Sequence, residues 1–265
     1  MSKIIQIKTP ATSANLGPGF DFFGIALSLY NVIQFEEVDD GKQIIEEIGF
    51  QNVGENLCKK CFEYIINKYC KAKKHYIISL IQNDIPVARG LGSSASAIVS
   101  GMVGANYFIN NMLDESQLID EMVNVEGHPD NILPCYLGGA VSSIYTDKLN
   151  YFKYNVNKDL YFNVLIPKYK VSTADARGVL PNNYQLSDVV FNSSRVMLLP
   201  KALESGDIDL VFHPIIDRYS NTNALIIQSN QHQVFGYFDG TIKVDDKTIE
   251  LKHLLGFAEM VKNRW

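Results

Sequence analysis

The chain carries one loop built almost entirely of small residues, Pro86-Val87-Ala88-Arg89-Gly90-Leu91-Gly92-Ser93-Ser94-Ala95-Ser96. A predicted strand, 75–82, leads into this loop, and an apolar segment compatible with a helix, 97–107, follows it. Glycine lets a backbone approach a ligand closely, and the N–H groups at a helix start attract anions. Two adjacent hydroxyls and the Arg89 guanidinium add further donors, so the loop predicts a polyphosphate site. The chain is therefore interpreted as a nucleotide-using enzyme.

Two common nucleotide-binding loops do not fit this segment. A Walker A loop requires Gly-Lys-Ser or Gly-Lys-Thr, which does not occur in the 265 residues. Residues 90–95 satisfy the dinucleotide pattern G-x-G-x-x-A, but that pattern also requires an acidic residue at the end of a second strand about 20 residues on. Asp114 and Glu115 occupy that region and instead introduce a predicted helix at 116–125. The dinucleotide interpretation is therefore set aside.

Composition and charge limit the classes of function. Apolar residues make up 46% of the chain and charged residues 20%, as in ordinary globular proteins. The formal net charge of −5 argues against a general nucleic-acid or membrane-surface binder, because both need a basic surface. No apolar run has the length of a spanning helix, and residues 1–7 alternate without the apolar core of a signal peptide. We expect a cytoplasmic protein with no nucleic-acid and no membrane partner.

The four cysteines agree with that expectation. Cys58 and Cys61 have the spacing of half a zinc site, but no second pair of Cys or His follows at a suitable distance. They fall in an amphipathic helical pattern at 56–69, where cysteine commonly serves as a small buried hydrophobe. Cys70 and Cys135 carry no motif, so we expect reduced thiols in the core.

The order of predicted elements favours an α+β fold, because strands and helices mix without regular βαβ alternation. The N-terminal two thirds predict strands at 4–8, 25–38, 75–82, 141–144, 149–154 and 160–167, a turn-rich segment at 9–21, and helices at 56–69, 116–125 and 172–179. The C-terminal part predicts a loop at 220–223, strands at 223–227, 233–238 and 241–244, a hairpin at Asp239-Gly240, and a helix at 254–263.

Two further segments concentrate polar groups. Pro10–Asp21 lacks bulky side chains until Phe20 and holds Thr12, Ser13, Asn15 and Asp21, which suits a small polar substrate. A turn-rich surface connection is an equally good interpretation of that segment alone. The other segment reads Glu126-Gly127-His128-Pro129-Asp130-Asn131 and places two carboxylates, an imidazole and a carboxamide in one tight loop. Together with a phosphate loop elsewhere, this density favours a functional over a structural role.

The three segments, in this order, resemble the homoserine kinases of the GHMP small-molecule kinase superfamily, over roughly residues 3 to 210. The first and third segments separate homoserine kinases from mevalonate and galactose kinases. The resemblance implies a two-lobe α+β fold, with a ribosomal-protein-S5-like N-terminal, ATP-binding lobe at 1–150 and part of a ferredoxin-like C-terminal lobe at 151–210. It implies phosphorylation of the L-homoserine hydroxyl in threonine biosynthesis, with ATP and Mg²⁺ as cofactors, and a homodimer as the family's usual assembly.

The resemblance also implies roles for single residues. The loop Pro86, Val87, Ala88, Arg89, Gly90, Leu91, Gly92, Ser93, Ser94, Ala95 and Ser96 would cradle the nucleotide phosphates, and Asn56 matches an asparagine that meets the adenine. Residues matching those around the amino-acid substrate are Asn15, Asp21, His128 and Asn131. Thr173 and Arg177 match a Thr-x-x-Ala-Arg pattern whose arginine faces the substrate carboxylate and the transferring phosphate.

Arg177, Asp21 and Asn131 are therefore the catalytic candidates. Ser94 and a carboxylate from the helix that follows, either Asp120 or Glu126, form the candidate magnesium ligands. The general base stays open, because Asp21 and direct proton loss to the phosphate are both consistent with the chemistry.

The C-terminal part departs from the family pattern. The third glycine-rich motif of GHMP kinases is not found, and Val211–Ser220 stands where homoserine kinases usually carry a Pro-Tyr-Arg segment. We therefore expect residues 211–265 to be a β-rich tail of different origin, through gene fusion or a sequence-assembly artefact. An incomplete C-terminal lobe predicts weak or absent kinase turnover. A GHMP kinase for another small alcohol and an inactive nucleotide-binding homologue are the alternatives.

Overall fold

The computed structural model describes residues 3–50, 56–70, 74–162, 183–206, 208–224, 227–244 and 247–264. The chain divides into two compact units. The N-terminal unit comprises Met1–Leu16, Phe20–Val87 and Leu91–Lys153, and the C-terminal unit comprises Gly17–Gly19, Ala88–Gly90 and Tyr154–Trp265. Each unit is described by itself.

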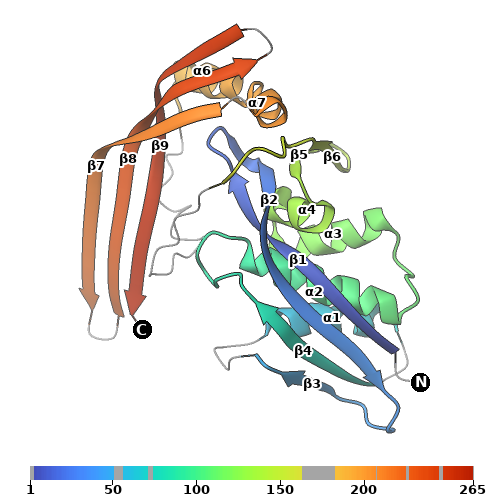
Figure 1. The fold of residues 1–265 in the computed structure, drawn as a ribbon. Coiled ribbons are helices and arrows are strands. Elements are labelled where there is room, and N and C mark those ends of the chain that lie inside the picture. The colour runs from blue at the N-terminus through green and yellow to red at the C-terminus, as the bar shows by residue number, and fades with distance from the viewer. Residues whose placement is uncertain are drawn as a thin grey trace. The chain divides into compact units, whose positions relative to one another are not determined.

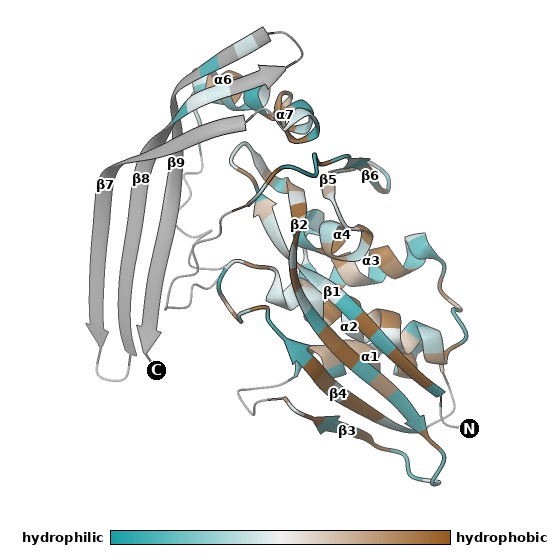
Figure 2. Ribbon diagram, in the orientation of Figure 1, coloured by the Kyte–Doolittle hydropathy of each residue, from teal (hydrophilic) through white to brown (hydrophobic). Residues whose placement is uncertain are grey.

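A six-stranded sheet forms one layer of the N-terminal unit (Figure 1). Its strands are β1 (Lys3–Asn15), β2 (Gly19–Val38), β3 (Ile45–Ile48), β4 (His75–Asn83), β5 (Ala140–Tyr145) and β6 (Leu149–Tyr154). The order is β3-β4-β2-β5-β6, with β1 paired to β2. β2 runs antiparallel to β4 and β5, whereas β3 is parallel to β4. In β2, the buried residues Asn31, Ile33 and Phe35 alternate with more exposed ones, as expected for a strand with one face against a core, and hydrophobic and hydrophilic residues are interspersed along it (Figure 2).

Four helices cover one face of this sheet: α1 (Leu57–Tyr69), α2 (Ser93–Phe108), α3 (Glu115–Glu126) and α4 (Pro129–Leu137). α1 and α3 begin at side-chain caps, Asn56 and Asp114 respectively, and Asp114 forms a capping box with Gln117. α2 begins differently, at Gly92, whose φ of 65° is left-handed and which supplies no side-chain cap. None of the helices within the described ranges is long and apolar enough to cross a membrane.

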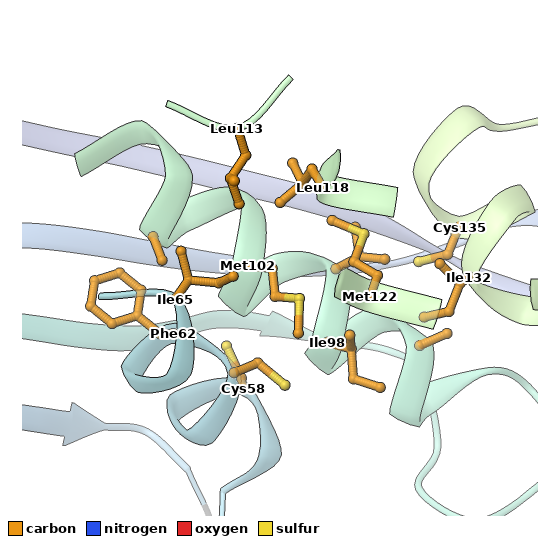
Figure 3. Packing of buried hydrophobic residues seen from close by; sticks show 14 of the residues in the cluster. Cys58, Phe62, Ile65, Ile98, Met102, Leu113, Leu118, Met122, Ile132 and Cys135 are labelled. Carbon is orange, nitrogen blue, oxygen red and sulfur yellow. The ribbon is translucent and has the colours of Figure 1, made fainter. Parts of the chain in front are cut away.

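The core lies between the helices and the sheet (Figure 3). The Phe62 ring stacks on Phe35 with centroids 5.3 Å apart and meets Tyr76 and Phe108 edge-on. Two glycines bring α2 close to its neighbours. A Cβ at Gly101 would lie 2.3 Å from the Cys58 carbonyl oxygen, and one at Gly104 would lie 2.8 Å from the Phe35 ring. α2 is therefore the central helix of the unit, held against both α1 and β2.

Three of the four cysteines lie in the core, as the sequence predicts. Cys58, Cys61 and Cys135 are buried, Cys70 is only half-buried, and none of the four forms a disulfide. Burial raises the pKa of Cys61 to about 12, so its thiol stays protonated at neutral pH.

The C-terminal unit contains α6 (Leu186–Val196), α7 (Leu199–Ser205) and three long strands, β7 (Ile208–Ala224), β8 (Ile227–Val244) and β9 (Lys247–Arg264). The strands form an antiparallel sheet in the order β7-β8-β9. Asn157 fixes the end of α7, since its backbone N–H donates to the Leu203 carbonyl and its Nδ2 donates to the Ser205 carbonyl, both at 2.8 Å.

Three sequence predictions for this part are wrong. Asp239-Gly240 does not form a hairpin but lies inside β8, where the register shifts between Phe238 and Gly240. The predicted loop at 220–223 lies within β7, and the predicted helix at 254–263 is part of β9. Pairing along the whole length of β8 overrides the local preferences of these segments.

In the N-terminal unit the α+β class is confirmed, and most predicted elements differ from the observed ones only at their ends. The prediction of one tight loop at 126–131 is wrong, because Glu126 ends α3 and Pro129 begins α4. The turn-rich segment predicted at 9–21 is wrong as well, because β1 continues to Asn15 and β2 begins at Gly19. Thr9, Ala11 and Thr12 are buried, so packing holds this segment in the sheet. Of the predicted strand at 160–167, residues 160–162 are not in a strand. The rest of that strand and the helix predicted at 172–179 lie outside the described residues.

Candidate active site

The start of α2 offers a group of backbone donors. Ala88, Gly90 and Gly92 all have left-handed φ values, of 55°, 71° and 65°. The first helical bond runs from Ser96 N–H to the Gly92 carbonyl at 2.9 Å, and the preceding N–H groups have no acceptor within the helix. With no cap from the Gly92 side, these donors and the positive end of the helix dipole suit a phosphate.

Thr12 places the segment Pro10–Asp21, the first of the three polar segments, against this loop. Its backbone N–H donates to the Leu91 carbonyl at 3.2 Å, and a Cβ placed on Gly92 would lie only 1.9 Å from Thr12 Oγ1. Position 92 therefore needs glycine for two reasons, the left-handed φ and the absence of space for a side chain.

The same threonine also contacts the segment Glu126–Asn131, the third of the three polar segments. Thr12 Oγ1 donates to Asn131 Oδ1 at 2.7 Å, so the amide Nδ2 is left as the donor that Asn131 can offer to a ligand. The start of α4 also lies directly on β2, because a Cβ on Gly24 would lie 1.9 Å from the Asp130 carbonyl oxygen. Three segments that are far apart in the sequence thus meet around one buried residue.

Ser94 and Glu126 form a second connection. The Ser94 hydroxyl, exposed in the first turn of α2, donates to the carboxylate of Glu126, the last residue of α3. Asp120 lies six residues earlier on α3 and, at 100° per residue, on a different face. The charge of Asp120 acts instead on Tyr145, whose pKa is raised first by desolvation and then by that charge. Of the two carboxylates predicted as magnesium ligands, Glu126 is the one that pairs with Ser94.

Four further polar residues of the segments Pro10–Asp21 and Glu126–Asn131 form two local pairs. Asp21 N–H donates to Asn15 Oδ1 at 2.8 Å, and both residues hold left-handed φ values, 65° and 71°. His128 precedes α4, and its Nδ1 lies 2.5 Å from Oδ1 of the buried Asp130. Strained backbone of the kind seen at Asn15 and Asp21 collects at functional sites.

Asn56 is engaged at the start of α1. Its Oδ1 accepts from the N–H groups of Cys58 and Lys59, and its Nδ2 donates to Glu47 Oε2 at 2.9 Å. Thr173 and Arg177 lie outside the described residues. The structure therefore brings together the first and third motifs and the phosphate loop, but it describes nothing of the Thr-x-x-Ala-Arg segment.

The side chains of the loop divide between surface and interior. Val87 is exposed, whereas Leu91, Ala95 and Ser96 are buried. The Ser96 hydroxyl lies 2.8 Å from Thr9 Oγ1, beneath the loop rather than at its surface. Thr9, Asn31 and Ser100, which sequence reasoning missed, complete this buried polar cluster. The only sequence signal for it is the pair of serines four residues apart, Ser96 and Ser100, on a helix whose centre is mostly apolar.

Family models match two parts of the chain. The GHMP kinases N terminal domain matches residues 56–139, and a domain of unknown function, DUF2804, matches residues 183–265. The DUF2804 match covers the C-terminal part of the chain, where GHMP kinases carry a glycine-rich motif that is not found here.

Whole-chain comparisons find homoserine kinases. The enzyme from Clostridium novyi is 41% identical over 209 residues, 78% of this chain and 70% of that protein. The enzyme from a Clostridium botulinum strain is 35% identical over 285 aligned positions, 99% of this chain and 94% of that protein. The crystal structure of homoserine kinase from Cytophaga hutchinsonii matches with a TM-score of 0.65 and 28% identity, over 77% of this chain and 68% of that one. The chain is therefore a kinase that belongs to the homoserine kinase family of the GHMP superfamily.

Proposed function

We propose that this chain transfers the γ-phosphoryl group of ATP to the side-chain hydroxyl of L-homoserine, giving O-phospho-L-homoserine for threonine biosynthesis. The convergence of the first and third motifs on the phosphate loop through Thr12 carries the proposal. The relatives named above are homoserine kinases, so neither another small alcohol nor an inactive nucleotide-binding role is favoured.

The phosphate loop is proposed to bind the nucleotide. Phosphoryl transfer depends mainly on positioning and on stabilising the negative charge of the transferring group. The N-terminal turn of α2 supplies aligned N–H groups for that charge, and Arg89 adds a cation on the same loop. Asn56 is proposed to meet the adenine, and its side-chain bonds to α1 and Glu47 would hold it in one orientation.

The pair Ser94–Glu126 fits a magnesium ion. A hydroxyl and a carboxylate are the hard oxygen ligands that Mg²⁺ takes, and such sites commonly use one or two protein groups together with phosphate oxygens. Bound there, Mg²⁺ would neutralise charge on the phosphate oxygens. We assign this role to Glu126 rather than Asp120.

The amino-acid substrate is proposed to lie among Asn15, Asp21, His128 and Asn131. The Asp21 carboxylate suits the substrate ammonium group, and Asn131 presents its Nδ2 as a donor because Thr12 occupies Oδ1. Arg177, with Thr173 nearby in sequence, is proposed to face the substrate carboxylate and the transferring phosphate. The hydroxyl proton passes either to Asp21 or directly to the phosphate.

A coupled assay of ADP release tests the proposal, with homoserine, threonine, mevalonate and no acceptor run in parallel. ADP release that depends on homoserine and exceeds release with the other acceptors supports it. Equal release with mevalonate, or none above the acceptor-free rate, contradicts it. We further propose that the enzyme is cytoplasmic and that it forms a homodimer. Sedimentation of the purified chain tests the homodimer directly.

A further inference from the structure

The buried polar cluster beneath the phosphate loop consists of Thr9, Asn31, Ser96 and Ser100, each less than a tenth exposed. Thr9 Oγ1 lies 2.8 Å from Ser96 Oγ and 3.2 Å from Ser100 Oγ, which ties β1 to the first two turns of α2. Asn31 Nδ2 donates to Ser96 Oγ at 3.3 Å. Buried polar groups are costly unless they are paired, so this cluster holds a defined arrangement.

Asn31 stands at the point where β4 leaves the sheet. It pairs with Asn83 at the end of β4, and the N–H of Asp84 still donates to the Tyr30 carbonyl at 3.3 Å. The next N–H, that of Ile85, turns to the side chain of Asn31 and donates to Oδ1 at 3.0 Å. The carboxamide thus continues the hydrogen-bond ladder by one residue and fixes where the loop begins.

One side chain therefore holds both ends of the loop. Its Oδ1 fixes Ile85 before the glycines, and its Nδ2 fixes Ser96 after them. We propose that Asn31 is a positioning residue for nucleotide binding, which sets the direction of the N–H groups at the start of α2 by fixing the loop at Ile85 and Ser96. This inference rests on the proposed function only in taking the ligand of the loop to be ATP.

The chain offers a matched control at the other end of the same helix. Asn106, also buried, donates from Nδ2 to the Leu113 carbonyl at 3.0 Å and accepts from the Leu113 N–H at 3.1 Å. Asn31→Leu and Asn106→Leu therefore each remove a buried carboxamide that joins α2 to a neighbouring loop by hydrogen bonds. Only the first touches the phosphate loop.

The test measures binding of MgATP to the full chain without acceptor, by calorimetry, alongside the KM for each substrate. Asn31→Leu is expected to weaken MgATP binding by about tenfold or more and to change the KM for homoserine by less than about twofold. Asn106→Leu is expected to lower the melting temperature while changing MgATP binding by less than about twofold. Equal losses of binding in both variants would overturn the inference, because the effect would then be general loosening of α2.

Ser96→Ala is the second variant and decides the matter if Asn31→Leu does not fold. Alanine is favoured in a helix, and the fully buried Ser96 side chain does not reach the surface of the loop, so its loss acts only through the cluster. Weaker MgATP binding supports the inference, and unchanged binding overturns it. If the unaltered chain binds MgATP but does not turn over homoserine, the proposed function fails while the role of Asn31 is still decided by binding. If it binds no MgATP, both fail.

Discussion

Thr12 Oγ1 donates a hydrogen bond to Asn131 Oδ1 at 2.7 Å, across 119 residues of sequence. Thr12 is fully buried and lies against Gly92, so the bond connects Asn131, a proposed substrate-binding residue, to the phosphate loop. Because an amide has one acceptor and one donor end, fixing the acceptor decides which end of Asn131 a substrate meets.

Replacing Thr12 therefore tests how Asn131 is oriented. Thr12→Val keeps the shape and the backbone bond to Leu91 but removes the hydroxyl, and it is expected to raise the KM for homoserine about tenfold. Thr12→Ser keeps the hydroxyl and should stay close to the unaltered enzyme. Steady-state kinetics with homoserine varied at saturating ATP distinguish them, and equal behaviour of the two variants would contradict the assigned role.

The two carboxylates of α3 are expected to differ in their effect on magnesium. Glu126→Gln removes the charge that pairs with Ser94 and should lower kcat about a hundredfold while raising the Mg²⁺ concentration needed for half-maximal rate. Asp120→Asn makes the same chemical change on another face of the helix and should leave that concentration unchanged. A larger shift with Asp120→Asn would reverse the assignment.

Gly92→Ala is expected to abolish nucleotide binding. A Cβ at this position would lie 1.9 Å from Thr12 Oγ1, and the φ of 65° costs a side chain about 1–2 kcal/mol as well. Gly41→Ala is the control, since its φ is 75° but no described atom would lie within 4 Å of the added carbon. Calorimetric titration with MgATP should show loss only for Gly92→Ala. Retained affinity would mean that the loop adapts to the methyl group.

Glu121 links α1 to α3 and predicts a dependence of stability on pH. It accepts hydrogen bonds from Tyr64 Oη at 2.7 Å, from Tyr69 Oη at 2.5 Å and from Lys68 Nζ at 2.7 Å. Burial alone raises the pKa of Glu121, but the bonds from Lys68, Tyr69 and Tyr64 outweigh it and the pKa is lowered.

A lowered folded-state pKa adds stability above the unfolded value, about 4.3, and that stability is lost as the pH falls through the folded-state pKa. Glu121→Gln should therefore cost about 1 kcal/mol of unfolding free energy at pH 7, with a smaller difference below pH of about 4. Urea unfolding at both pH values measures this. A difference that does not change with pH would contradict the account.

The departure of residues 211–265 from the family pattern predicts a low kcat for homoserine phosphorylation. They lack the Pro-Tyr-Arg segment and the third glycine-rich motif, and residues 183–265 match DUF2804. Replacing residues 211–265 with the corresponding C-terminal part of the Clostridium novyi enzyme is expected to raise kcat at least about tenfold, while the affinity for MgATP stays the same. If the unaltered chain already matches the kcat of that relative, the proposed deficit is contradicted.

Much of the N-terminal unit could be predicted because its signals are local. The helical pattern at 56–69 predicted α1, which the structure shows to begin after the cap Asn56, and the acidic start at Asp114 predicted α3. The extent of β1 could not be predicted, since Thr9–Asn15 is held in the sheet by burial that composition alone does not reveal. Long-range pairing likewise explains why Asp239-Gly240 is a register shift rather than a turn.

The site divides along the same line. Motif spacing indicated the phosphate loop and the polar segments, but it did not indicate what joins them. Thr12 and Asn31 act through bonds to residues 119 and 65 positions away, and no pattern within either segment encodes those partners. Ser94 and Glu126 were candidates by chemistry, and only the geometry of α3 separates Glu126 from Asp120.

Gly101 and Gly104 have a mechanical consequence for the catalytic cycle. Without side chains at these positions, α2 packs directly on the backbone of α1 and on the ring of Phe35, and a Cβ at either position would collide with them. In the proposed ATP site, the N-terminus of a helix held this closely would already be ordered before the triphosphate binds, which reduces the entropic cost of binding.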